Sequence, residues 1–136
     1  MIAALIFVVS VAALGQFFVS YCRAVLSSGR KAALSDGVRD AAHIESPAVA
    51  ASDFARILTL ARICPEAGHD TRELRAVRVY YYLLDLLERA ARSLSPPVAA
   101  WAELERQGCA HFAAVTLDRR IAHSRELMRQ VYHNHF

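Results

Sequence analysis

The first 22 positions of the chain form an uninterrupted hydrophobic run. No Asp, Glu, Lys or Arg precedes Arg23, and 18 of these residues are hydrophobic. As a helix that rises 1.5 Å per residue, the run spans roughly 33 Å, against about 30 Å for the hydrocarbon core of a bilayer. A cleaved signal is disfavoured, because nothing basic precedes the run and bulky Tyr21 stands where a lipoprotein cleavage box needs Gly or Ala. We therefore predict a retained transmembrane anchor with a juxtamembrane extension over residues 1–28.

A second pattern begins at Ser52, where hydrophobic residues recur every three or four positions, as in an amphipathic helix. A first helix is predicted from Ser52 until Pro65 and Gly68 end it. The strongest pattern covers residues 71–94. Its hydrophobic stripe consists of Leu74, Val77, Tyr81, Leu84, Leu87, Ala91 and Leu94.

Ser95 and Pro96 predict the start of a last helix, because Ser is a common N-cap and Pro suits the first helical position. We expect this helix to bend or break near Gly108. The predicted boundaries are a linker at 29–51, a helical domain at 52–132 and a frayed tail at 133–136. No segment of consequence alternates with period two and carries β-branched residues. The fold class is therefore all-α: one N-terminal transmembrane helix followed by a small cytoplasmic bundle of about three helices.

The composition indicates a thin core. Of the 57 hydrophobic residues after position 22, 21 are alanine, so few large side chains remain to be buried. A domain of this size lies near the lower limit for independent stability, and contact with the membrane or a partner would help it. The contents of Gly, Pro and Cys exclude a collagen-like fibre and a disulfide scaffold.

Charges beside the anchor predict its orientation. Arg23, Arg30, Lys31 and Arg39 follow the run, and only the amino terminus precedes it. The positive-inside rule then places Met1 outside and the rest of the chain in the cytoplasm, at the inner (plasma) membrane of a bacterium. Arg23, Arg30 and Lys31 are predicted to contact lipid headgroups. The three widely spaced cysteines contain no CxxC and suit a reducing compartment.

Small and polar residues recur every four positions along the anchor, and they include Ala12, Gln16 and Ser20. The Gln16 amide needs hydrogen-bond partners inside a bilayer, so this stripe is a candidate helix–helix contact. Alternatively, Ser20 already lies at the membrane surface and Gln16 is a single tolerated polar residue.

Two features of the 71–94 helix suggest an interaction surface. Arg72, Arg75 and Arg78 step by three along one face, and Tyr80 or Tyr82 could lie outside the core stripe at Tyr81. A solvated face, or a helix contacted on several sides, explains the same residues. The net charge is only +3, with acidic residues interspersed, so nucleic acid is not an expected partner.

Cys109, His111, His123, His133 and His135 are the candidates for metal or redox chemistry. Side chains two positions apart on a helix point about 200° from each other, so Cys109 and His111 cannot readily share an ion. His133 and His135 supply only two ligands, whereas a zinc site needs three or four. We therefore predict no metal and no cofactor, and a metal- or redox-responsive sensor that uses these five residues remains the alternative function.

Motifs of catalysis are missing from the sequence. It contains no G-x-S-x-G, no glycine-rich phosphate loop and no Rossmann fingerprint. The sequence favours a single-pass, membrane-anchored helical interaction module: an adaptor, an accessory subunit or a regulator of a membrane complex rather than an enzyme. Its expected partners are membrane lipid and either another protein or further copies of this chain.

Overall fold

The computed structural model describes residues 1–30, 34, 39–40, 43–44, 50–64 and 70–135. The elements in chain order are α1 (Ile2–Arg30), the short 3-10 helix η1 (Ala51–Asp53), α3 (Phe54–Ile63), α4 (Asp70–Ala91) and α5 (Pro96–Asn134). Within these ranges all regular structure is helical and no strand occurs, which confirms the predicted all-α class.

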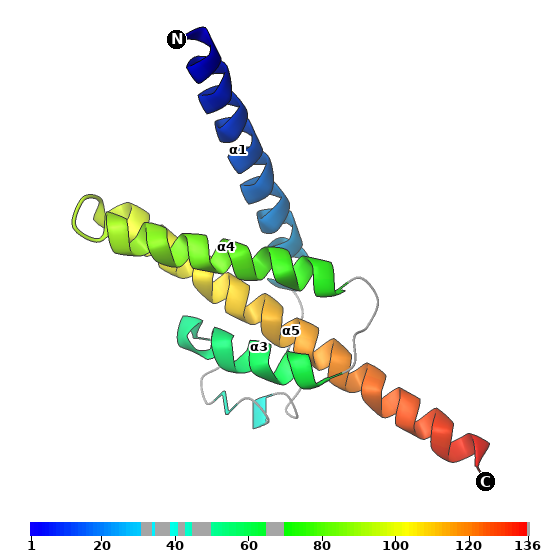
Figure 1. The fold of residues 1–136 in the computed structure, drawn as a ribbon. Helices are drawn as coiled ribbons and strands as arrows, with labels where there is room; N and C mark the ends of the chain where they lie inside the picture. The colour runs from blue at the N-terminus through cyan, green and yellow to red at the C-terminus, as the bar shows by residue number, and fades with distance from the viewer. Residues whose placement is uncertain (31–33, 35–38, 41–42, 45–49, 65–69, 136) are drawn as a thin grey trace.

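Helix α1 stands apart from the bundle over most of its length (Figure 1). Its 29 residues correspond to about 43 Å. The first seventeen residues of the chain are exposed, and burial begins only where α1 meets the other helices, at Cys22, Leu26 and Gly29. Helix α1 is thus long and apolar enough to cross a membrane. The boundary predicted at 28/29 falls inside this helix, because its last turns belong to the core.

Helices α4 and α5 form an antiparallel hairpin, and α3 packs beside them (Figure 1). Helix α4 ends at Ala91, three residues before the predicted end at position 94, and the hairpin turn begins there. The Ser95 amide donates a hydrogen bond to the Ala91 carbonyl across this turn, at 2.7 Å. Ser95 is the N-cap of α5, as predicted, and its carbonyl accepts hydrogen bonds from Val98 and Ala99. Pro96 occupies the first helical position.

The core lies where α1, α3, α4 and α5 meet. Its largest fully buried hydrophobic side chains come from all four helices: Leu26, Phe54, Ile57, Val77, Phe112 and Leu117. Helix α5 continues without interruption through Gly108, contrary to the predicted bend or break. Gly108 lies under α1, where a Cβ would be 3.5 Å from the Arg30 guanidinium. Gly108 therefore lies at the contact between α5 and α1 and does not break α5.

Candidate functional site

The inner end of α1 is fixed to the helical domain by close contacts. The Phe18 ring packs edge-on against Tyr80 of α4, with 6.4 Å between ring centroids. Gly29 approaches α5 so closely that a Cβ there would lie 3.1 Å from the Phe112 ring. Because both neighbouring helices hold it, this part of α1 is an element of the domain as well as the end of the helix that is apolar enough to cross a membrane.

A buried carboxylate joins three helices at this junction. Glu105 of α5 is 5% exposed and accepts hydrogen bonds from the Tyr80 hydroxyl at 3.0 Å and the Arg30 guanidinium at 3.2 Å. Burial, together with the nearby Glu105 charge, raises the pKa of Tyr80, so its hydroxyl remains a proton donor. Glu105 therefore links the end of α1 to α4 and α5 through polar contacts inside an otherwise apolar region.

A second polar cluster lies farther along the hairpin. The Arg106 guanidinium, on α5, contacts side chains of four residues: Tyr81, Asp85, Glu88 and Glu103. Hydrogen bonds from Arg92 and then Arg106 lower the pKa of Glu88. Burial alone lowers the pKa of Arg106, but the bonds to Tyr81 and Glu88 outweigh it, so the net pKa is raised. The cluster is a network of ion pairs and hydrogen bonds that holds the two arms of the hairpin together.

A cavity of about 260 Å³ lies between α3, α4 and α5. Its described lining consists of Leu58, Arg62, Cys64, Thr71, Leu74, Arg75, Arg78 and Arg120. At its edge the buried Arg120 donates to the Ala61 carbonyl at 2.6 Å and the Thr71 hydroxyl at 3.3 Å. Guanidinium and hydroxyl donors are suited to an oxyanion. Four arginines thus line this pocket, and guanidinium groups are donors that favour an anion.

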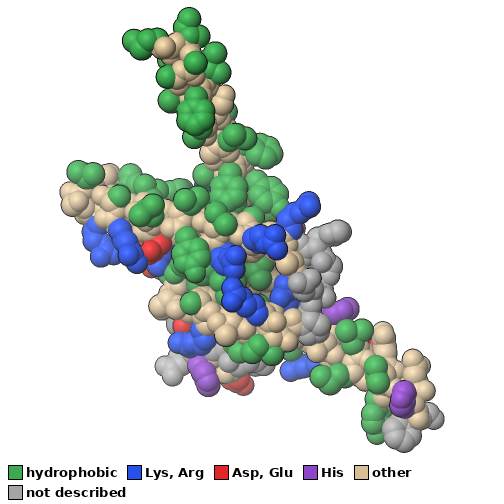
Figure 2. Space-filling model, in the orientation of Figure 1, with side chains coloured by type: hydrophobic (Ala, Val, Ile, Leu, Met, Phe, Trp, Pro, Cys, Tyr) green, Lys and Arg blue, Asp and Glu red, His purple; other side chains and the backbone are tan. Residues whose placement is uncertain are grey.

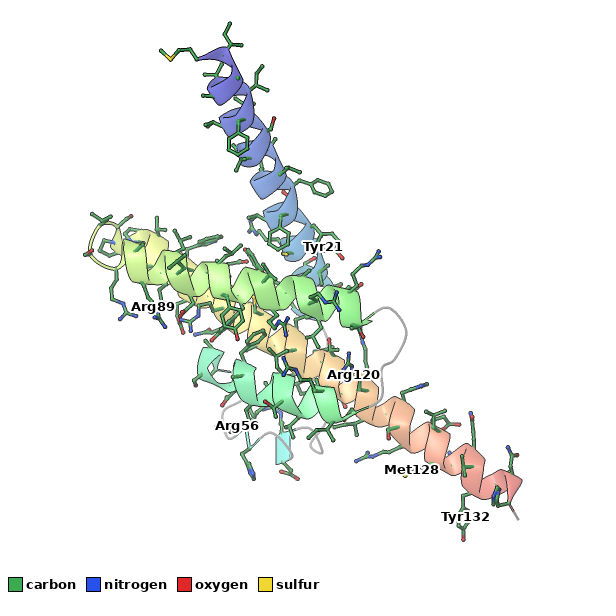
Figure 3. All side chains as sticks on the ribbon, in the orientation of Figure 1. Tyr21, Arg56, Arg89, Arg120, Met128 and Tyr132 are labelled. Carbon is green, nitrogen blue, oxygen red and sulfur yellow. The ribbon has the colours of Figure 1, made fainter. Side chains whose placement is uncertain are left out.

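Apolar side chains are exposed elsewhere on the described part of the domain, and two groups of them are distinguished by their position. One, the hairpin surface, occupies the α4–α5 hairpin near its turn and consists of Leu83, Leu87, Leu94, Val98, Trp101 and Leu104. The other, the terminal stripe, lies on the end of α5 that projects beyond the bundle and consists of Leu127, Met128, Val131 and Tyr132. Figure 3 shows Met128 and Tyr132 on this projecting end, away from the other helices.

The predicted tyrosine and arginine surface is only partly present. The assignment of Tyr80 to an interaction surface was wrong: its side chain is 2% exposed and faces Phe18 and Glu105. Tyr81, predicted to lie in the core stripe, is half-buried and stacks on Phe54 with 4.0 Å between centroids. Tyr82 is 59% exposed, as a surface residue must be.

The three predicted arginines, Arg72, Arg75 and Arg78, lie in the first half of α4. Arg72 and Arg75 are exposed and Arg78 is half-buried. Arg75 and Arg78 line the anion-suited pocket together with Arg62, which lies on α3. The pocket thus combines two of the predicted residues with an arginine that sequence spacing did not connect to them.

The predicted residues of α1 lie in two settings. Ala12, Gln16 and Ser20 are exposed, so the candidate contact stripe remains open along the free part of the helix. Arg23 is exposed, whereas Arg30 pairs with Glu105. Lys31 lies outside the described residues. A role for these groups in helix pairing or headgroup contact stays a prediction.

The structure does not bring the candidate metal and redox residues together. Cys109 is buried in the core, and burial, assisted by the Glu105 charge, raises the pKa of its thiol to about 12. His133 and His135 lie at the exposed end of α5. Within the described part of the chain, no group of three or more His, Cys, Asp or Glu side chains is placed to hold a metal ion.

Comparison with protein-family models, with curated proteins and with solved structures finds no match to this chain.

Sequence reasoning overlooked Glu105 and the hairpin surface. The signal for Glu105 is a lone carboxylate in a stripe that otherwise holds Ala102, Cys109 and Phe112. A charged residue at such a position is almost never buried unless it is paired. The signal for the hairpin surface is a surplus of leucines, because Leu83 and Leu86 widen the apolar face of α4 beyond the predicted stripe. Leu87, which belongs to that stripe, is 40% exposed rather than buried in the core.

Proposed function

We propose that this chain is a single-pass membrane protein whose helical domain acts as an interaction module: an adaptor, an accessory subunit or a regulator of a membrane complex. Its domain lies in the cytoplasm and Met1 outside, at the inner (plasma) membrane. The exposed arginine at position 23 and the pair Arg30–Lys31 support this orientation, because basic residues beside a span favour the cytoplasmic side.

The terminal stripe is the observation that carries this proposal. Helix α5 extends past the bundle, and there Met128, Val131 and Tyr132 are each more than half exposed on successive turns of one face. A helix that presents an apolar stripe beyond its own core is suited to pair with another amphipathic helix. The partner we propose is therefore a helix with a complementary apolar face, supplied by a membrane complex.

Site-specific photocrosslinking in cells tests this assignment. A photoreactive residue replaces Val131 in the full-length chain, and the matched control places the same residue at His133, roughly 200° away on the same exposed helix. We expect a discrete crosslinked product from position 131 and little from position 133. Mass spectrometry then identifies the partner.

Each outcome of this experiment bears on the proposal. A product with a different membrane-associated protein supports an adaptor or subunit. A product of twice the mass of the chain replaces the adaptor with a self-assembling module. Equal crosslinking from positions 131 and 133, or none from either, would contradict docking at the terminal stripe.

The alternative of a metal- or redox-responsive sensor has weaker support. It needs Cys109 to react or to bind a metal together with histidines, and the Cys109 thiol is buried with a raised pKa. A thiol in such surroundings is a poor nucleophile and a poor metal ligand, because the thiolate is the reactive form. No observation favours the sensor over the interaction module.

A further inference from the structure

The depth of the domain relative to the bilayer follows from the contacts of α1. About 20 helical residues are needed to cross a hydrocarbon core, so a span that begins at Ile2 ends near Tyr21. Yet Phe18 already packs on the Tyr80 ring, and the Cys22 thiol contacts the Ala76 carbonyl at 3.9 Å. The part of α4 around Tyr80 must therefore lie level with the inner boundary of the membrane.

The hairpin surface continues the face of α4 that holds α1. Leu83 follows Ala76 by seven residues, and Leu87 follows Tyr80 by seven, so these leucines lie two turns farther along the same side of the helix. Both are exposed, because α1 has risen away from α4 by this point. This face of α4 therefore packs against α1 around Ala76 and Tyr80 and is exposed to solvent around Leu83 and Leu87. It carries apolar side chains in both parts.

Helix α5 repeats this arrangement on the other arm of the hairpin. Gly108 lies against Leu26 and Arg30 of α1. Trp101 and Leu104 precede Gly108 by seven and four residues and so lie on the same side of α5. They are 37% and 64% exposed. Both arms thus present large apolar side chains on the side from which α1 leaves the domain.

The charged residues that pair near the hairpin turn lie on the other side. Asp85, Glu88, Arg89 and Arg106 pair with one another or with neighbours across the two arms. Near the hairpin turn, Figure 2 shows hydrophobic side chains along the edge of α4 that faces α1 and charged ones on the edge turned away from it. The hairpin is therefore amphipathic, with its apolar side at the level of the membrane boundary.

We propose that the hairpin surface is a bilayer-contacting face, which lies in the interfacial layer of the leaflet through which α1 leaves the membrane. Trp101 would be at the boundary between headgroups and acyl chains, the position that tryptophan favours. The leucines around it bury their apolar area there, as in an interfacial amphipathic helix. This inference requires α1 to span the bilayer, but it does not depend on a partner at the terminal stripe.

Trp101 is the only tryptophan in the chain, so it reports on this contact without labelling. The full-length chain is reconstituted in phosphatidylcholine vesicles whose acyl chains carry bromine near the headgroup. We expect a blue-shifted Trp101 emission and a loss of roughly half of its fluorescence relative to unbrominated vesicles, because bromine quenches on contact. Leu83→Glu together with Leu87→Glu should restore most of this fluorescence while circular dichroism still reports helix.

A second variant serves as the matched control. Trp101→Phe combined with Tyr132→Trp moves the single tryptophan to the projecting end of α5, and we expect bromine to leave its fluorescence unchanged. Two results would overturn the proposal: unquenched Trp101 with solvent-like emission, or unquenched Trp101 with blue-shifted emission, which means that protein covers the surface. Crosslinking at Val131 is scored separately, so failure here leaves the interaction module standing.

Discussion

Among single residues, Glu105 has the largest structural consequence. It is a buried carboxylate whose two hydrogen bonds come from different helices, Tyr80 on α4 and Arg30 on α1. A carboxylate in such a place is stable only while it is paired, since removal of one partner exposes the desolvation cost of the charge. The position of the membrane anchor on the domain therefore depends on a few specific donors.

The Tyr80 hydroxyl is one of these donors, and its removal should be measurable. Tyr80→Phe keeps the ring that packs on Phe18 but removes the bond to Glu105. We expect the free energy of unfolding to fall by about 2 kcal/mol, the usual effect of a lost hydrogen bond to a charged group. Denaturant unfolding of the full-length chain in detergent measures it. Tyr82→Phe, at an exposed neighbouring ring, is the control. An equal loss of unfolding free energy in both variants would contradict a stabilising role for the Tyr80–Glu105 hydrogen bond.

Glu88 predicts a specific acid sensitivity. Its pKa in the folded chain is lowered from 4.5 by bonds from Arg92 and Arg106, so its stabilising effect is present above pH 4.5 and is lost as pH falls through the folded pKa. We expect Glu88→Gln to be less stable at neutral pH and to lose less stability between pH 5 and acid than the parent chain.

The measurement for Glu88 is the unfolding free energy in detergent at a series of pH values. Glu126→Gln, at a carboxylate on the exposed end of α5, should retain the pH dependence of the parent chain. If Glu88→Gln shows the same slope with pH as the parent chain, the ion pairs around Arg106 contribute nothing to acid stability.

At the scale of elements, the junction between α1 and α5 depends on a helix-to-helix approach that only small residues permit. Gly29 has the Phe112 ring within 3.1 Å of where its Cβ would be, whereas Gly15, on the free part of α1, has nothing within 4 Å. Close packing thus favours glycine at position 29 and does not require it at position 15, although both lie on the same helix.

These glycines form a matched pair for mutation. Gly29→Leu should force α1 away from α5 and reduce the free energy of unfolding by about 1–3 kcal/mol, the usual cost of overpacking. Gly15→Leu should leave domain stability unchanged. Unfolding and limited proteolysis of both chains in detergent give the comparison, and a Gly29→Leu chain as resistant as the parent would refute the close junction.

Sequence patterns predicted the elements better than the faces they bury. The order of the helices and the start of α5 at Pro96 came from hydrophobic period and capping residues, which are local properties. By contrast, which tyrosine is fully buried, Tyr80 rather than Tyr81, depends on contacts between residues far apart in the sequence. Tyr80 is buried because the inner end of α1 covers that side of α4. The spacing of hydrophobic residues within α4 gives no information about where α1 packs.

At the scale of the whole molecule, the orientation of the anchor decides which compartment contains the domain. Arg23 is the first charged residue of the sequence, and Arg30, Lys31 and Arg39 come after it. A reporter active only in the cytoplasm, fused after Phe136, should therefore be active, and one active only in the periplasm should be silent. Added lysines before Ile2, with Arg23 and Arg30 changed to Gln, should weaken this preference. The reverse pattern in the parent chain would show that the domain is translocated.

The sequence alone determined the class of this protein, because its strongest signals act over short distances. A charge-free run of 22 residues favours a bilayer wherever it occurs, and periodic leucines favour helices. Only the tertiary structure decided which of those leucines are covered. The inner turns of α1 join the bundle and bury Tyr80 and Glu105, while Leu83, Leu87 and Trp101 remain open because α1 leaves the surface before it reaches them.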